Sequence, residues 1–118
     1  MKNILLCLLC IVPITITHAE KLTQRQYYET IYNMMNELEE TETLKEKALN
    51  ADDKKEFSKK QCKLLNILED IVKVSSDNQN LESGYSFKVT AEERLRYEIG
   101  LMKKGNVDKE MVCNYSFL

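Results

Sequence analysis

Cysteine and histidine are the residues best suited to nucleophilic, redox or metal chemistry, and this chain holds few of them. Its 118 residues include four cysteines and one histidine. Cys7, Cys10 and His18 all lie in the N-terminal segment. Beyond that segment no imidazole remains to act as a general base, to complete a nucleophilic triad or to bind zinc. We therefore expect a protein that is not an enzyme, with no catalytic, cofactor-binding or metal-binding residue.

The N-terminal segment has the three parts of a cleavable signal peptide. One lysine precedes an apolar run over residues 4–16, and a small residue, Ala19, stands where cleavage would occur. The alternative, an uncleaved membrane anchor, is disfavoured because such a helix needs about 20 apolar residues and Pro13 interrupts this one. We expect residues 1–19 to be removed. Residues 20–118 would form a single periplasmic or secreted domain with no membrane span.

The two remaining cysteines, Cys62 and Cys113, are expected to form a disulfide. Disulfides form in oxidising compartments, and a pair is the smallest set that can do so. The alternatives are a redox dithiol or a pair of metal ligands. Both commonly show a close spacing such as C-x-x-C, whereas these two cysteines are far apart in the sequence. A bridge across about 50 residues would contribute roughly 4 kcal/mol to stability.

Two amphipathic helices are predicted in the first part of the domain. The first begins after Thr23, which can cap it, and the second begins after Asp53, which forms a capping box with Glu56 and continues to Val74. The apolar face of the first comprises Tyr27, Ile31, Met34, Met35 and Leu38. The face of the second comprises Phe57, Leu64, Leu65, Leu68, Ile71 and Val72, and Gln61 falls on the same stripe.

An antiparallel hairpin is the expected arrangement of these two helices. A turn at residues 51–52 pairs Leu38 with Leu65, and Ile31 with Val72. The rival is one continuous helix, since neither glycine nor proline marks the break, but globular helices are seldom that long. The same register brings an acidic cluster beside a basic one, so we expect these charges to form a solvated face. The clusters are Glu37, Glu39, Glu40, Glu42 and Glu46, and Lys54, Lys55, Lys59, Lys60 and Lys63.

A third helix completes the expected fold. Residues 75–86 are polar and predict a loop, and the alternation over residues 85–89 is compatible with a short strand. Thr90 and Glu93 form a capping box before a helix that ends at Gly105. The fold class is therefore all-α. We expect a small bundle of about three helices, namely the hairpin plus a third helix, with one disulfide and a short strand or packed C-terminal tail.

The best candidate for a binding surface lies on the first helix. Tyr28, Tyr32 and Met35 stand beside its apolar face, and aromatic residues and methionine are enriched in protein interfaces. Core packing is the alternative for part of this segment. The formal net charge of −2 does not favour nucleic acid. Asn114 lies in an N-glycosylation sequon, which matters only in a eukaryotic secretory pathway.

Together these features favour binding of another protein outside the cytoplasm. The expected function is that of an inhibitor or immunity-type protein, whose partner is an exported enzyme or toxin. The alternative is an envelope accessory or chaperone-like protein that holds a lipid or peptide between amphipathic helices. An apolar groove between helices would support this alternative, and a filled core would not.

Overall fold

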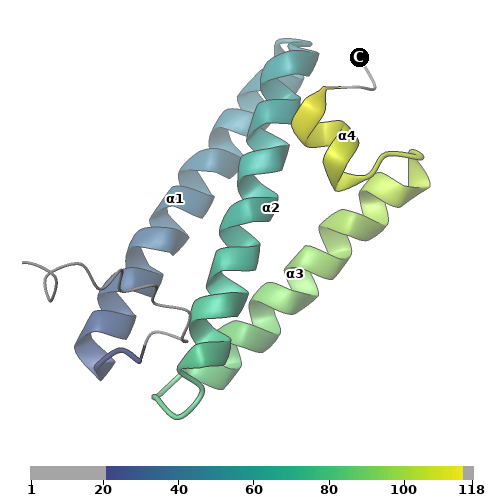
Figure 1. Ribbon diagram of the computed structural model, residues 1–118. Helices are drawn as coiled ribbons and strands as arrows, with labels where there is room; N and C mark the ends of the chain where they lie inside the picture. The colour runs from purple at the N-terminus through teal and green to yellow at the C-terminus, as the bar shows by residue number, and fades with distance from the viewer. Residues whose placement is uncertain (1–20, 116–118) are drawn as a thin grey trace, which may run out of the picture.

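The computed structural model describes residues 21–115, which form four α-helices and contain no strand (Figure 1). The predicted signal peptide, residues 1–19, lies outside the described residues. The all-α fold and the disulfide are both confirmed. The helices are α1 (Gln24–Asn50), α2 (Lys54–Asp77), α3 (Gly84–Lys104) and the short α4 (Lys109–Asn114).

Helices α1 and α2 form the predicted antiparallel hairpin, so the continuous helix is ruled out. Thr23 caps α1 in a capping box with Gln26. The chain turns at Asp52, which has a positive φ of 54°. The side chain of Asp53 then accepts a hydrogen bond from the backbone N–H of Glu56 and so begins α2. These caps satisfy backbone donors at the start of each helix, which explains why the helices begin there.

The register of the hairpin agrees with the predicted one within a few residues. The Tyr27 hydroxyl lies 2.9 Å from the Ser75 hydroxyl, in the buried interior. An ion pair of 3.2 Å joins Glu37 to Lys63. The predicted pairing of the other charges is wrong in detail. Lys60 pairs with Glu56 of its own helix, and Glu42 pairs with Arg94 of α3, a residue that the hairpin alone could not supply.

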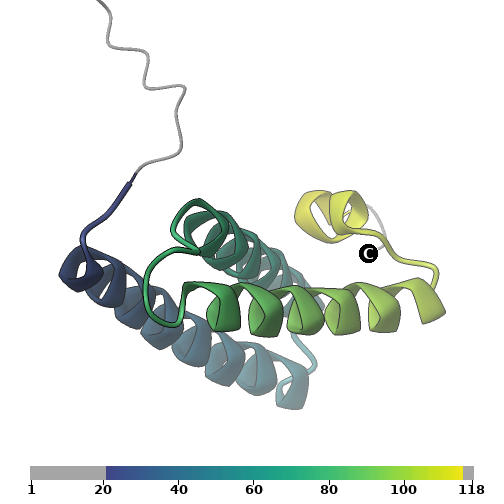
Figure 2. The ribbon, with the colours of Figure 1, turned by 90° about the horizontal axis from the view of Figure 1, so that it is seen from below.

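Helix α2 is central, because it packs against α1, α3 and α4. Figure 1 shows α3 diverging from α2 towards its C-terminal end, with α4 in the angle between them. Seen from below, α1, α2 and α3 are arranged as a triangle (Figure 2). The core lies inside it and comprises Tyr27, Ile31, Leu38, Leu64, Ile67, Leu68, Ile71 and Ala91.

The expected strand over residues 85–89 is wrong, because α3 already begins at Gly84. The chain turns at Ser83, whose φ is 65°. Gly84 then lies so close to α2 that an added Cβ would be 2.3 Å from the carbonyl oxygen of Asn78. Phe87 packs on Tyr27, with ring centroids 6.5 Å apart. Residues 85–89 are therefore stabilised more by packing as a helix on Tyr27 than they would be as an isolated strand. Because α3 begins at Gly84, Thr90 lies inside the helix and does not cap it.

The start of α1 is tied to the loop between α2 and α3. The backbone N–H of Leu22 donates to the side-chain oxygen of Asn78 over 2.9 Å. Gln24 and Glu82 exchange two hydrogen bonds, because the Gln24 amide both donates to the Glu82 carbonyl and accepts from its N–H. Asn78 is 1% exposed. This end of the bundle is therefore closed by polar contacts as well as by apolar packing.

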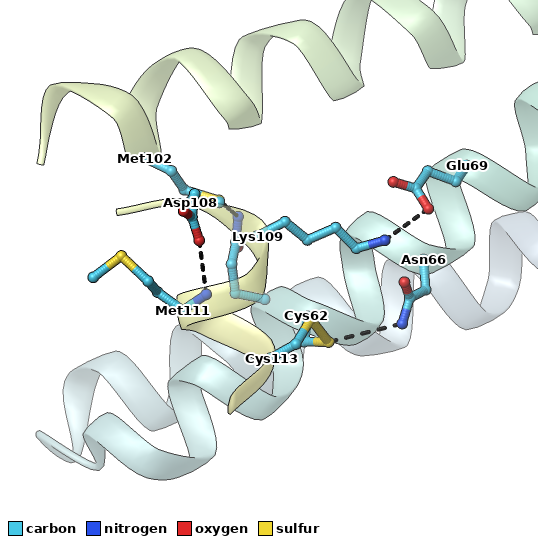
Figure 3. Close-up of a disulfide and its surroundings, with 9 residues drawn as sticks. Cys62, Asn66, Glu69, Met102, Asp108, Lys109, Met111 and Cys113 are labelled. Atoms are coloured by element: carbon cyan, nitrogen blue, oxygen red, sulfur yellow. Dashed lines mark hydrogen bonds and ion pairs between the residues drawn. A yellow bond between two sulfur atoms is a disulfide. The ribbon is translucent and has the colours of Figure 1, made fainter. Parts of the chain in front are cut away.

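The disulfide fixes α4 to α2 (Figure 3). Cys62 and Cys113 have Cα atoms 5.1 Å apart, within the usual range for a bridged pair. An ion pair of 2.7 Å between Lys109 and Glu69 lies beside it. Val112 of α4 is buried, with 3% of its surface exposed. The bridge therefore holds the C-terminal helix against the middle of α2.

Candidate functional site

The predicted binding residues form an exposed patch on α1. Tyr28, Tyr32 and Met35 are 40%, 67% and 42% exposed. We call these three residues the aromatic patch. Neighbouring Tyr27 is fully buried, and burial raises its pKa, although its hydrogen bond with Ser75 opposes the shift. The segment is thus divided between core and surface. A role in binding stays a prediction.

A groove of about 400 Å³ lies beside the aromatic patch, between α1 and α3. Tyr28 and Tyr32 line one side, and Phe87 of α3 lines the other side. Ile31, a core residue of α1, also lines the groove. Glu29 supplies the charged group on this wall. The lining is therefore mostly apolar and aromatic, as in sites that accept an apolar side chain.

The aromatic patch continues along α1 as an acidic edge. Tyr28, Tyr32 and Met35 are spaced by four and three residues, and the same spacing continues to Glu39, Glu42 and Glu46. Residues at this spacing share one helix face. Glu39 and Glu46 are exposed, whereas Glu42 pairs with Arg94. A partner on this face would meet apolar groups at one end and carboxylates along the edge.

A second group of polar residues lies inside the bundle around Glu98. The sequence pattern placed Gln61 of this group on an apolar stripe, but the burial of Glu98 was not predicted. Glu98 is 4% exposed and occupies a core position of α3. Its carboxylate accepts hydrogen bonds of 3.0 Å from Gln61 and 2.9 Å from Arg94. The ammonium group of Lys45 donates to Gln61 over 3.0 Å and lies 3.8 Å from Glu98. Three helices therefore contribute to one network.

The sequence did carry a signal for Glu98. The residues that face the core along α3 are spaced by three or four, namely Ala91, Leu95 and Met102, and Glu98 occupies the one charged position in this series. A charged residue on an apolar stripe is seldom buried without a partner. Gln61 on the stripe of α2 is the corresponding signal on the facing helix, and it is the partner that Glu98 uses.

The electrostatics of Glu98 favour a structural ion pair over proton transfer. Burial alone would raise the pKa of Glu98, but the hydrogen bond from Gln61 and the charges of Lys45 and Arg94 outweigh it and lower the pKa below its usual value. The pKa of Arg94 is raised, because its carboxylate partners outweigh the effect of burial. A general acid near neutral pH needs a raised carboxyl pKa. This network instead keeps its charges.

A cavity of about 270 Å³ adjoins this network. Its polar wall includes Lys45, Gln61, Glu98 and Ser58. Ser58 is fully buried, and its hydroxyl has no hydrogen-bond partner among the described residues. The apolar wall comprises Phe57, Leu101, Met102, Val107 and Val112. The cavity is therefore formed by α2, α3 and the segment that the disulfide holds in place.

Within residues 21–115, no three His, Cys, Asp or Glu side chains come together where they could hold a metal ion. No helix in that part of the chain is long and apolar enough to span a membrane. Compared with known protein families, curated proteins and solved structures, the chain shows no match. Its function must therefore be inferred from its own residues.

Proposed function

We propose that this chain is an exported protein that binds another protein through the aromatic patch. The sharper form of the proposal is an inhibitor or immunity-type protein, whose partner is an exported enzyme or toxin. The observation that carries the proposal is the exposure of Tyr28, Tyr32 and Met35 side by side, next to an open groove. Tyrosine and methionine in such a position are typical of the centre of a protein interface.

The scaffold supports this proposal. The aromatic patch belongs to a 27-residue helix whose adjacent face is buried against α2, so the helix backbone needs little rearrangement on binding. Preorganisation of this kind lowers the entropic cost of association. The disulfide is compatible with an oxidising compartment, as expected for an exported protein.

The charge of the surface limits the kind of partner. Glu29 lines the groove, and exposed Glu39 and Glu46 continue the same edge. A partner with one protruding apolar or aromatic side chain and basic groups beside it would complement this surface. Such charge complementarity mainly speeds association and weakens with salt.

Capture from an envelope or culture extract tests the proposal, with the purified protein as bait. We expect one stoichiometric partner, an exported hydrolase or toxin. Replacing Tyr28 and Tyr32 together by alanine should weaken binding at least about 30-fold, the loss expected for interface hot spots. Thermal unfolding should be nearly unchanged, since both side chains are exposed.

Tyr85→Ala is the matched control. Tyr85 is 65% exposed on α3. It lies about two and a half helical turns before Arg94, and the half turn places it on the opposite side of the helix. Arg94 faces α1, so Tyr85 points away from the groove. It should bind like the parent protein. Equal capture by the Tyr28/Tyr32 variant and the parent would remove the aromatic patch from the proposal. Turnover of a substrate by the pure protein would overturn the non-enzymatic assignment.

The groove also favours a second candidate function, an accessory or chaperone-like protein that holds a lipid or peptide. It is open, apolar and bounded by two amphipathic helices, as this function requires. The same capture experiment separates the two candidates. Recovery of lipid, or of many unfolded proteins instead of one folded partner, would favour the accessory function.

Export itself has a direct test. N-terminal sequencing of the natural protein should begin at Glu20 if the proposed signal peptide is removed. Material that begins at Met1 and is found inside the cell would contradict both the proposed cleavage and the proposed location.

A further inference from the structure

The aromatic patch is the middle of a longer stripe along α1, in which the positions alternate by three and four residues. The stripe starts with one cation, passes through the three residues of the aromatic patch and ends with three carboxylates. This spacing is the heptad repeat of helices that pair lengthwise with another helix. We call it the heptad stripe, and its members are Arg25, Tyr28, Tyr32, Met35, Glu39, Glu42 and Glu46.

The heptad stripe is separate from the face of α1 that packs in the bundle. The buried residues of α1 lie on that other face and are Tyr27, Ile31, Leu38, Thr41 and Ala48. In the stripe, the side chain of Arg25 is 88% exposed, and Glu39 and Glu46 are exposed as well. Glu42 is partly covered by Arg94. A second helix can therefore lie along this stripe without displacing the core.

The order of the charges makes the heptad stripe complementary to a reversed copy of itself. When two copies run antiparallel with Tyr32 of one opposite Met35 of the other, Tyr28 lies opposite Glu39 and Arg25 lies opposite Glu42. In a two-fold symmetric dimer every such contact occurs twice. The apolar side chains then meet at the centre, the Tyr28 hydroxyl can donate to a carboxylate, and opposite charges meet at both ends.

Other arrangements of two copies lose these contacts. In a parallel pair, the carboxylates of Glu39, Glu42 and Glu46 would each face the same residue of the second copy, which is unfavourable. Shifting the antiparallel pair by one heptad places Glu42 opposite Tyr32, or beyond the start of the helix. The charges of the stripe therefore select one orientation and one register, as polar residues do in paired helices.

The ion pairs within one chain are compatible with this pairing. Arg25 pairs with Glu29 of the same helix, but the two side chains are 88% and 62% exposed. Such surface pairs contribute little to stability, so Arg25 can exchange its partner at little cost. Arg94 contacts Glu42 from α3. Arg25 of a second copy would approach the same carboxylate from the open side of α1.

We propose that this chain forms an antiparallel homodimer through the heptad stripe, with the aromatic patches of both copies at the centre of the interface. The groove beside Tyr32 gives room for an apolar side chain of the second copy. Because the dimer covers the aromatic patch, self-association limits the access of another protein to it. This regulatory consequence rests on the proposed function, whereas the dimer itself does not.

Sedimentation equilibrium of the purified protein, with its disulfide formed and no partner present, tests the dimer. We expect a monomer–dimer equilibrium with a dissociation constant of about 1–100 µM, since small interfaces are weak. Raising the NaCl concentration from about 0.05 M to about 0.5 M should weaken the dimer several-fold, because exposed charges are screened. A protein that is monomeric at about 1 mM would overturn the inference.

Charge reversal tests the register. Arg25→Glu and Glu42→Arg should each weaken the dimer at least about tenfold, because each places like charges opposite each other. An equimolar mixture of the two variants should dimerise again, because both facing pairs in the mixed dimer have opposite charges. Glu40→Arg and Arg96→Glu change exposed residues outside the stripe, so these matched controls should dimerise like the parent.

Unchanged dimerisation of Arg25→Glu, or equal weakening by the two controls, would refute the antiparallel register. Arg25 pairs within α1 alone, so this variant stays informative if loss of the Arg94 contact makes Glu42→Arg less stable. The Tyr28/Tyr32 variant should be monomeric, and a persistent dimer would place the interface elsewhere. A monomeric parent that still captures a partner would overturn this inference alone. A dimeric parent that captures none would overturn the proposed function alone.

Discussion

Reduction of the Cys62–Cys113 disulfide is expected to release α4 while α1, α2 and α3 stay folded. Helix α4 has six residues and packs on α2. Its main apolar anchor is Val112, and its ion pair joins Lys109 to Glu69. The other three helices share a separate core that α4 does not enter.

The magnitudes explain why the bridge is needed. Burial of one valine contributes about 1.5–3 kcal/mol. A half-exposed ion pair such as Lys109–Glu69 adds less than about 1 kcal/mol. Ordering the six residues of α4 costs about 1–2 kcal/mol each in backbone entropy. This total cost exceeds the combined contribution of the buried valine and the ion pair. The bridge also joins residues 51 apart, and its loss should lower the free energy of unfolding by up to about 4 kcal/mol.

Hydrogen exchange and urea unfolding measure the two effects. After reduction, or in the Cys62→Ser/Cys113→Ser variant, amides of residues 109–114 should exchange freely, and those around Leu65 and Leu68 should stay protected. The urea midpoint should fall by roughly 2 M, for a slope of about 2 kcal/mol/M. Protected α4 amides in the reduced protein, or loss of all protection in one step, would refute this reasoning.

Two further predictions concern packing and charge. Gly84→Ala should destabilise the fold by about 1–3 kcal/mol in urea unfolding, because the added Cβ would clash with the backbone of Asn78. Gly100→Ala should stabilise it by about 0.5–1 kcal/mol, because nothing lies within 4 Å of the added Cβ. If Gly100→Ala were the more destabilising of the two, the close approach of Gly84 to Asn78 would be contradicted. The pKa of Glu98 is lower in the folded chain than in the unfolded chain. The ionised carboxylate therefore contributes its full stabilisation above the unfolded pKa of about 4.5, and this stabilisation is lost as the pH falls through the folded pKa. Glu98→Gln should therefore unfold more easily than the parent at neutral pH, with the difference shrinking in acid, and a gap that stays constant from pH 2 to 7 would refute the linkage.

The hairpin could be predicted from the sequence because several local signals agreed. Thr23 and Asp53 both cap helices as expected, and the apolar stripes require the two helices to face each other. The disulfide was predictable from the number of cysteines and the expected compartment. The exposure of Tyr28 and Tyr32 followed from their positions beside the apolar stripe.

What failed in the prediction depended on contacts between distant residues. Five alternating residues after Gly84 cannot distinguish a strand from a helix, and the close approach of Gly84 is to Asn78, the residue that follows α2. The cavity depends on the angle between α2 and α3, which no local pattern encodes.

The central place of α2 has a consequence for how the chain folds. Two hairpins, α1 with α2 and α2 with α3, are both local in sequence, and each can serve as a nucleus. Substitutions in the α2 stripe, such as Leu68→Ala, should slow folding by either route. Those in α1 or α3, such as Ile31→Val or Ala91→Gly, leave the other route open and should mainly speed unfolding.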